Sequence, residues 1–211
     1  WSDLLSGLSY IRSQRVIVAL ISIGMITGLF ASSLPTLLPV FATEILGGDV
    51  QTYGNLLLSS GIGGMAGAIA LASFGGLRNS SFVQIWTGVC LGAAYIALSG
   101  ISWIPAAIGA LATIGACSVS FGTINNTLLQ SLLEDAYRGR VMSMHQIGWG
   151  ASAVGGILVG TLAELLSVSF ALALCGGITT LSIGALSIFV SRKLKSHSSN
   201  LTFDEKSSLS S

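Results

Sequence analysis

Long apolar stretches alternate with short polar ones along this chain, and the alternation is its main structural signal. An apolar stretch of about 20 residues is long enough to cross the hydrocarbon core of a bilayer as an α-helix. The predicted spans are residues 16–42, 53–76, 82–100, 104–133, 141–162 and 168–191. The sequence therefore predicts an all-α membrane protein with six transmembrane helices, and we expect the first span to tilt or kink at its prolines, Pro35 and Pro39.

The composition supports a membrane protein. Hydrophobic residues make up 52% of the chain and charged residues 8%, whereas soluble domains usually carry about 25% charged residues. Cys90, Cys117 and Cys175 lie singly within apolar stretches, so they indicate core packing rather than a metal site or a disulfide framework. We expect no metal, no cofactor and no nucleic-acid partner.

Two segments lie outside the predicted spans. Residues 1–15 form a partly amphipathic lead-in that is expected to lie along the membrane surface. Because this opening lacks the basic start and the cleavage site of a signal peptide, we interpret it as a cytoplasmic linker within a longer protein. Residues 192–211 are polar and rich in serine, which predicts a disordered cytoplasmic tail.

The charged residues between the spans divide by sign. Lysine and arginine are enriched in the cytoplasmic loops of membrane proteins. The basic residues at one set of span ends are Arg12, Arg15, Arg78, Arg138, Arg140, Arg192, Lys193 and Lys195. The opposite ends carry Glu44, Asp49 and Glu164, without lysine or arginine. Both termini are therefore predicted to be cytoplasmic, in a multi-pass protein of the inner (plasma) membrane.

A dense cluster of charge separates the fourth and fifth predicted spans. Four charged groups occur within residues 134–140, between long uncharged stretches. Placing a charge at the centre of the bilayer costs roughly 2.5 kcal/mol or more. Residues 134–143 are therefore predicted to be a turn that emerges into water.

Small residues recur four positions apart in the second and fifth spans. The pairs are Ser60 with Gly64, Gly63 with Gly67, and Gly156 with Gly160. This spacing allows two helices to approach closely. The glycine-rich run at 61–67 also nearly fits a dinucleotide-binding pattern, but that pattern needs a strand, a turn and a helix around it. We therefore predict close helix packing at these positions.

The two halves of the chain contain a faint internal repeat. SGIGG at 60–64 resembles SAVGG at 152–156, and each lies in the second span of a group of three. Groups of three spans have opposite orientations in the membrane, so the prediction is two inverted three-helix repeats, a plan found in secondary transporters. Similar composition alone would also explain the likeness, and the sequence leaves both interpretations open.

Polar side chains gather near the cytoplasmic end of the fourth span and at the start of the fifth. They are Thr123, Asn125, Asn126, Thr127, Gln130, His145, Gln146 and Trp149. Polar groups within a bilayer face other helices or a water-filled path. Interhelical hydrogen bonding alone would explain them, and the alternative is that they line a translocation path or its gate. The substrate-path candidates are Thr27, Asn55, Asn126, Gln130, Gln146 and Trp149.

Two observations concern proton coupling. His145 could titrate near neutral pH, although a lone histidine near a helix end is more often a hydrogen-bonded group than a proton carrier. The middle of each predicted span lacks a carboxylate. If transport is driven by protons, the coupling acid is expected outside this chain.

The sequence argues against an enzyme. An intramembrane serine protease would need a nucleophile with a base and an oxyanion hole. Neither Gly-x-Ser-x-Gly nor the zinc-protease pattern His-Glu-x-x-His occurs, and the histidines are His145 and His197.

The charged cluster is also where the chain resembles a known family. NTLLQ at 126–130, followed by Asp135 and by RGRVMS at 138–143, resembles the turn between spans ten and eleven of major facilitator superfamily transporters. GLSYIR at 7–12 and LPVFA at 38–42 resemble the seventh span of such a protein. The resemblance covers residues 1 to about 195 and is nearest to bacterial exporters of the enterobactin-exporter and macrolide-efflux type.

This resemblance implies twelve spans in two six-helix halves, with this chain as the C-terminal half. The first, second, fourth and fifth spans would line a cavity between the halves, and the third and sixth would face lipid. The turn would close the cytoplasmic side as a gate, through Asp135, Arg138, Gly139 and Arg140. A second cytoplasmic signature of the family would fall at residues 75–79, where its acid and second base are missing.

The expected function is secondary active transport by alternating access. The resemblance implies proton-coupled efflux of a small amphipathic compound such as a drug or a siderophore. The expected partners are this substrate, the lipid bilayer and the N-terminal six-helix half, on the same or a separate chain. The alternative is a non-transporting six-span membrane scaffold or partner subunit.

Overall fold

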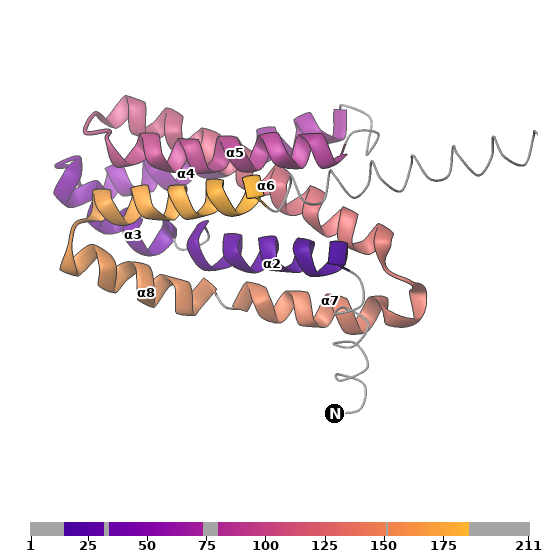
Figure 1. Cartoon of the computed structure of the whole chain (residues 1–211). Coiled ribbons are helices and arrows are strands. Elements are labelled where there is room, and N and C mark those ends of the chain that lie inside the picture. The colour runs from indigo at the N-terminus through magenta and orange to yellow at the C-terminus, as the bar shows by residue number, and fades with distance from the viewer. Residues whose placement is uncertain (1–14, 32–33, 74–79, 151, 186–211) are drawn as a thin grey trace, which may run out of the picture.

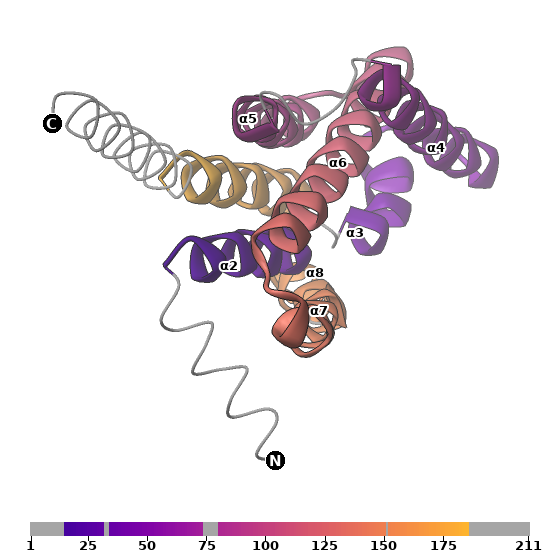
Figure 2. The ribbon, with the colours of Figure 1, turned by 90° about the vertical axis from the view of Figure 1, so that its right-hand side faces the viewer.

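The computed structural model describes residues 15–31, 34–73, 80–150 and 152–185, and within these ranges the regular elements are all helices. The long helices run roughly parallel and antiparallel to one another (Figure 1). Seen from the end, α6 (Ile104–Leu132) crosses the molecule from α4 (Val50–Ser73) to α7 (Asp135–Gly150), as Figure 2 shows. The predicted all-α membrane architecture is therefore confirmed.

The first span changes helix type along its length, around its prolines. It consists of α2 (Arg15–Phe30), α3 (Leu34–Val40) and a π-helical turn, η2 (Phe41–Ile45). Pro39 lies inside α3 and has no backbone N–H to donate to the helix ladder. Thr43 Oγ1 donates a 3.1 Å hydrogen bond to the Pro39 carbonyl oxygen, at the start of the π-helical turn.

Five helical segments of the described chain are long and apolar enough to cross a membrane. They are Val16–Ile45, α4, Phe82–Ser99 within α5 (Ser80–Ser99), α6, and a final helix, Val168–Ala185. The predicted third span extends to residue 100 and the predicted sixth span to residue 191. Residues 186–191 of the sixth span lie outside the described residues.

The predicted fifth span, 141–162, falls on two described helical segments on either side of residue 151, which lies outside the described residues. These are α7 and α8 (Ser152–Leu165), which follow one another along the bundle in Figure 1. The predicted turn over residues 134–143 is wrong, because α7 already begins at Asp135. The Glu134 carbonyl accepts hydrogen bonds from the backbone N–H groups of Tyr137 and Arg138, so the charged residues form the first turns of a helix.

The start of α4 is capped by its preceding acid. Asp49 Oδ1 accepts hydrogen bonds of 2.9 Å from the backbone N–H of Thr52 and 3.0 Å from its hydroxyl. These bonds from Thr52 hold the pKa of the exposed Asp49 carboxyl below its usual value. The acidic segment between the first two spans therefore has a local structural role.

Glycines bring α4 and α6 into backbone contact. A Cβ on Gly63 would lie 1.9 Å from the Ala112 carbonyl oxygen, and one on Gly67 would lie 2.5 Å from that of Ala116. Conversely, a Cβ on Gly115 would lie 2.0 Å from the Ser60 carbonyl oxygen. The predicted close packing of the second span is confirmed.

The glycine contacts are reciprocal between the two groups of three spans. A Cβ on Gly155 of α8 would lie 1.9 Å from the Leu29 carbonyl oxygen of α2, as Gly63 of α4 does against α6. Gly63 and Gly155 occupy the same place in SGIGG and SAVGG. Exchanging the first span with the fourth and the second with the fifth turns one contact into the other. The contacts thus support the interpretation of the likeness as an inverted repeat rather than as shared composition.

Candidate functional site

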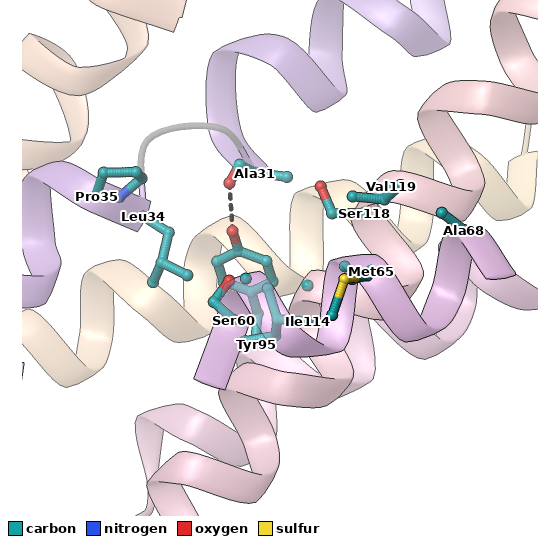
Figure 3. Close-up of a pocket in the computed structure, with 13 residues that line it drawn as sticks. Ala31, Leu34, Pro35, Ser60, Met65, Ala68, Tyr95, Ile114, Ser118 and Val119 are labelled. Carbon is teal, nitrogen blue, oxygen red and sulfur yellow. Dashed lines mark hydrogen bonds between the residues drawn. The ribbon is translucent and has the colours of Figure 1, made fainter. Parts of the chain in front are cut away.

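An open cleft of about 620 Å³ lies beside Pro35 of the first span (Figure 3). Its walls come from four spans. The lining residues are Ala31, Leu34 and Pro35 of the first span, Ser60, Gly61, Gly64, Met65 and Ala68 of α4, Tyr95 of α5, and Ile114, Gly115, Ser118 and Val119 of α6. Ligand clefts for small molecules commonly have volumes of about 300–1,000 Å³ and mostly apolar walls.

Tyr95 connects the cleft to the first span. Its side chain is 2% exposed, and its hydroxyl donates a hydrogen bond to the Ala31 carbonyl oxygen (Figure 3). Pro35, four residues after Ala31, has no backbone N–H to donate to that carbonyl. Tyr95 therefore satisfies a backbone carbonyl that Pro35 leaves without a helical partner.

The cleft is uncharged along its described wall. Hydroxyl groups come from Ser60, Ser118 and Tyr95, and the other side chains are apolar or absent. Its residues lie near the middle of α4 and α6, far from the ends of both helices. Three glycines, Gly61, Gly64 and Gly115, add no side chain to the cleft wall. A Cβ on Gly61 would meet nothing within 4 Å.

A second feature is a buried polar cluster where α2, α5, α6 and α7 meet. Gln84 Nε2 donates a 2.8 Å hydrogen bond to Asn125 Oδ1, and both side chains are buried. His145 is 1% exposed. A Cβ on Gly24 would lie 2.7 Å from His145 Cε1 and 3.1 Å from Asn125 Nδ2, so the two side chains meet against α2 where Gly24 leaves room.

Some buried polar atoms have no hydrogen-bond partner within the part of the chain that the structure describes. They are Thr27 Oγ1, Asn126 Oδ1, His145 Nδ1 and Thr179 Oγ1. A small cavity of about 20 Å³, lined in part by Gly24, Thr27 and Asn125, adjoins the cluster. Such unpaired groups are costly inside a bilayer, so the cluster is suited to a change in partners when helices move.

The predicted path residues are dispersed, and none of the five whose side chains the structure describes lines the cleft. Thr27 reaches the small cavity, and Asn126 is half-buried in α6. Asn55, Gln130 and Gln146 are exposed on their helices. The side chain of Trp149 lies outside the described residues.

Sequence reasoning missed two residues that the structure makes prominent, Gln84 and Tyr95. Gln84 is a single amide inside an apolar span, the same signal that identified the fourth span. Tyr95 carried no signal of its own, because its partner is a backbone carbonyl more than 60 positions away.

The predicted gate residues lie at the start of α7. Arg138 and Gly139 are exposed, and Arg140 is half-buried. The side chain of Asp135 is outside the described residues, and so is the segment 75–79 with the second expected signature. Among the described residues, no group of three His, Cys, Asp or Glu side chains is placed to hold a metal ion.

A comparison with protein families supports the resemblance to major facilitator superfamily transporters. A family model described as transmembrane secretion effector, of the major facilitator type, matches residues 2–208. A search of the curated proteins finds no match. Because the family match spans nearly the whole chain and the helices are those of a multi-pass membrane protein, this chain belongs to the transmembrane secretion effector family of major facilitator transporters.

Proposed function

We propose that this chain is the C-terminal six-helix half of an exporter that moves a small amphipathic compound out of the cell in exchange for protons. The observation that carries the proposal is the mostly apolar cleft beside Pro35 of the first span. Transporters commonly bind substrate near the membrane midplane, where an interrupted helix meets its neighbours. The cleft residues of α4 and α6 lie near the middle of those helices.

Alternating access gives the two features separate roles in this proposal. The cleft takes the apolar body of the substrate, with an N-terminal six-helix half closing over it. The buried cluster around Asn125 and His145 lies near the start of α5, at Gln84, and towards the end of α6, at Asn125. Movement of α7 against α2 would exchange the partners of these groups, and the acid that couples transport to protons would belong to the other half.

The test is to block the cleft without disturbing helix packing. Gly61 lines the cleft, and a Cβ there meets nothing within 4 Å, so Gly61→Trp places its indole in the cleft. We expect efflux of a fluorescent amphipathic dye from cells to fall at least about ten-fold, because an occupied cleft costs the substrate more than about 1.4 kcal/mol of binding. Efflux is measured at matched membrane levels of the protein.

The matched control is Gly177→Trp. Gly177 lies on the Val168–Ala185 helix, which contributes nothing to the cleft, and a Cβ there also meets nothing within 4 Å. This variant should transport like the unmodified protein. Equal efflux by both variants would contradict the cleft as the substrate site, and absence of any energy-dependent efflux from the unmodified protein would contradict the transporter itself.

A further inference from the structure

We propose that Tyr95 is the hydrogen-bond acceptor in the cleft for a ligand that combines a flat apolar body with an uncharged N–H or O–H donor. This inference rests on the proposed function, because it takes the cleft as the substrate site. It goes further by naming the chemistry of the ligand and the residue that selects it.

The first step concerns the direction of the Tyr95 hydroxyl. Its proton is committed to the Ala31 carbonyl oxygen. A phenolic hydroxyl that donates in this way keeps its oxygen lone pairs for accepting. Tyr95 is among the residues that line the cleft, and Figure 3 shows its hydroxyl directed at Ala31 with Ser60 and Ile114 beside the ring. The group that the cleft offers to a ligand at this point is therefore an acceptor.

The second step concerns the rest of the wall. Leu34, Met65, Ile114 and Val119 provide apolar surface. The described lining contains no cationic side chain, so a carboxylate placed here would be buried without a partner. A neutral, flat compound with a donor is thus preferred over an anion of the same size.

The third step links the ligand to the first span. A donor on the ligand, the Tyr95 hydroxyl and the Ala31 carbonyl would form a chain of hydrogen bonds, and such chains strengthen their members. Ligand binding would then tighten the contact between α5 and the end of α2. If Tyr95 served only to satisfy the Ala31 carbonyl, its loss would weaken the binding of every ligand alike.

Three related fluorescent probes separate these cases. Dansyl amide carries N–H donors, its N,N-dimethyl derivative has none, and dansylglycine adds a carboxylate to the same ring system. Binding is measured by fluorescence with the protein expressed from its native reading frame and reconstituted in nanodiscs. We expect dansyl amide to bind about three- to ten-fold more tightly than the dimethyl probe, the effect of one net hydrogen bond, and dansylglycine to bind most weakly.

The variant Tyr95→Phe removes the acceptor and keeps the ring. The affinity of the variant for dansyl amide should fall to its affinity for the dimethyl probe. Its affinity for the dimethyl probe should differ from that of the unmodified protein by less than about two-fold. Tyr53→Phe is the matched control, because Tyr53 lies on α4 outside the cleft, and it should keep the preference for the donor.

Three results would overturn the inference: no saturable binding of dansyl amide, equal affinities of the unmodified protein for the two neutral probes, or equal losses for both in Tyr95→Phe. The first two do not depend on how the variant folds. Gly61→Trp distinguishes the levels of failure. If Gly61→Trp abolishes probe binding but the unmodified protein binds both neutral probes equally, only the Tyr95 inference fails. If dansyl amide binds normally to Gly61→Trp, the cleft is not the site, and the proposed function loses its support too.

Discussion

At the level of single residues, amides join helices in the interior of the bundle. The 2.8 Å hydrogen bond between Gln84 and Asn125 connects α5 to α6 where both side chains are buried. In a bilayer each amide would otherwise keep an unpaired polar group, although measured side-chain bonds between membrane helices average only about 0.6 kcal/mol and reach about 1.7. The bond therefore specifies the pairing of these helices more than it stabilises the protein.

A double-mutant cycle measures this bond. Gln84→Met and Asn125→Leu should each lower the free energy of unfolding by about 1–2 kcal/mol, because each leaves the partner amide unsatisfied. The double variant should lose less stability than the sum of the two single losses, since neither apolar side chain needs a hydrogen-bond partner. Unfolding is followed in mixed detergent micelles with increasing SDS. Strictly additive losses would show that the two amides do not interact.

At the level of elements, backbone contact through glycine holds α4 against α6 and α8 against α2. The distances leave no room for even one methyl group, since a Cβ on Gly63 or on Gly155 would lie 1.9 Å from a carbonyl oxygen of the facing helix. Association of membrane helices depends on close van der Waals packing because lipid is as apolar as leucine. These two interfaces are thus direct sites at which to test the packing.

Gly63→Ala should destabilise the protein by about 1–3 kcal/mol, because the facing backbone of Ala112 must move to admit the methyl group. The comparison is Gly54→Ala on the same helix, where a Cβ meets nothing within 4 Å. That variant should be unchanged or up to about 1 kcal/mol more stable, since alanine favours helix. Thermal unfolding monitored by size-exclusion fluorescence checks both. A Gly63→Ala variant as stable as Gly54→Ala would mean that the interface is looser than the structure indicates.

At the level of the whole molecule, the ends of the bundle differ in charge. Figure 1 shows the start of α2 and the connection from α6 to α7 at one end, and the connection from α3 to α4 with the end of α8 at the other. Arg15, Arg138 and Arg140 belong to the first end, and Glu44, Asp49 and Glu164 to the second. The enrichment of lysine and arginine in cytoplasmic loops leads us to propose that the basic end faces the cytoplasm.

Cysteine labelling tests this orientation in cells, after the native Cys90, Cys117 and Cys175, which form no disulfide with one another in the structure, are replaced by alanine. Glu44→Cys and Gly139→Cys each add a thiol at an exposed position, at opposite ends of the bundle. A membrane-impermeant maleimide should label Glu44→Cys in intact cells and Gly139→Cys only after permeabilisation. The reverse pattern would place the basic end outside and overturn the proposed orientation.

The positions of helices followed from the sequence because the bilayer imposes a local rule. Apolar length, charge at span ends and the prolines at 35 and 39 each act within a few residues of where they occur. The charged stretch after residue 133 was misassigned because solvent-exposed charge suits both a turn and the exposed first turns of a helix. Only the backbone hydrogen bonds to the Glu134 carbonyl separate the two.

The sequence by itself thus determined the class of protein, the order of its spans and the positions that needed small residues. Tertiary structure alone decided which polar groups meet. The cleft joins Ala31 to Tyr95 across 64 positions, and the polar cluster joins Gln84 to Asn125 across 41. Periodicity reports which face of a helix is apolar, but the choice of neighbouring helix comes from packing between distant segments, and a cleft is the space which that packing leaves.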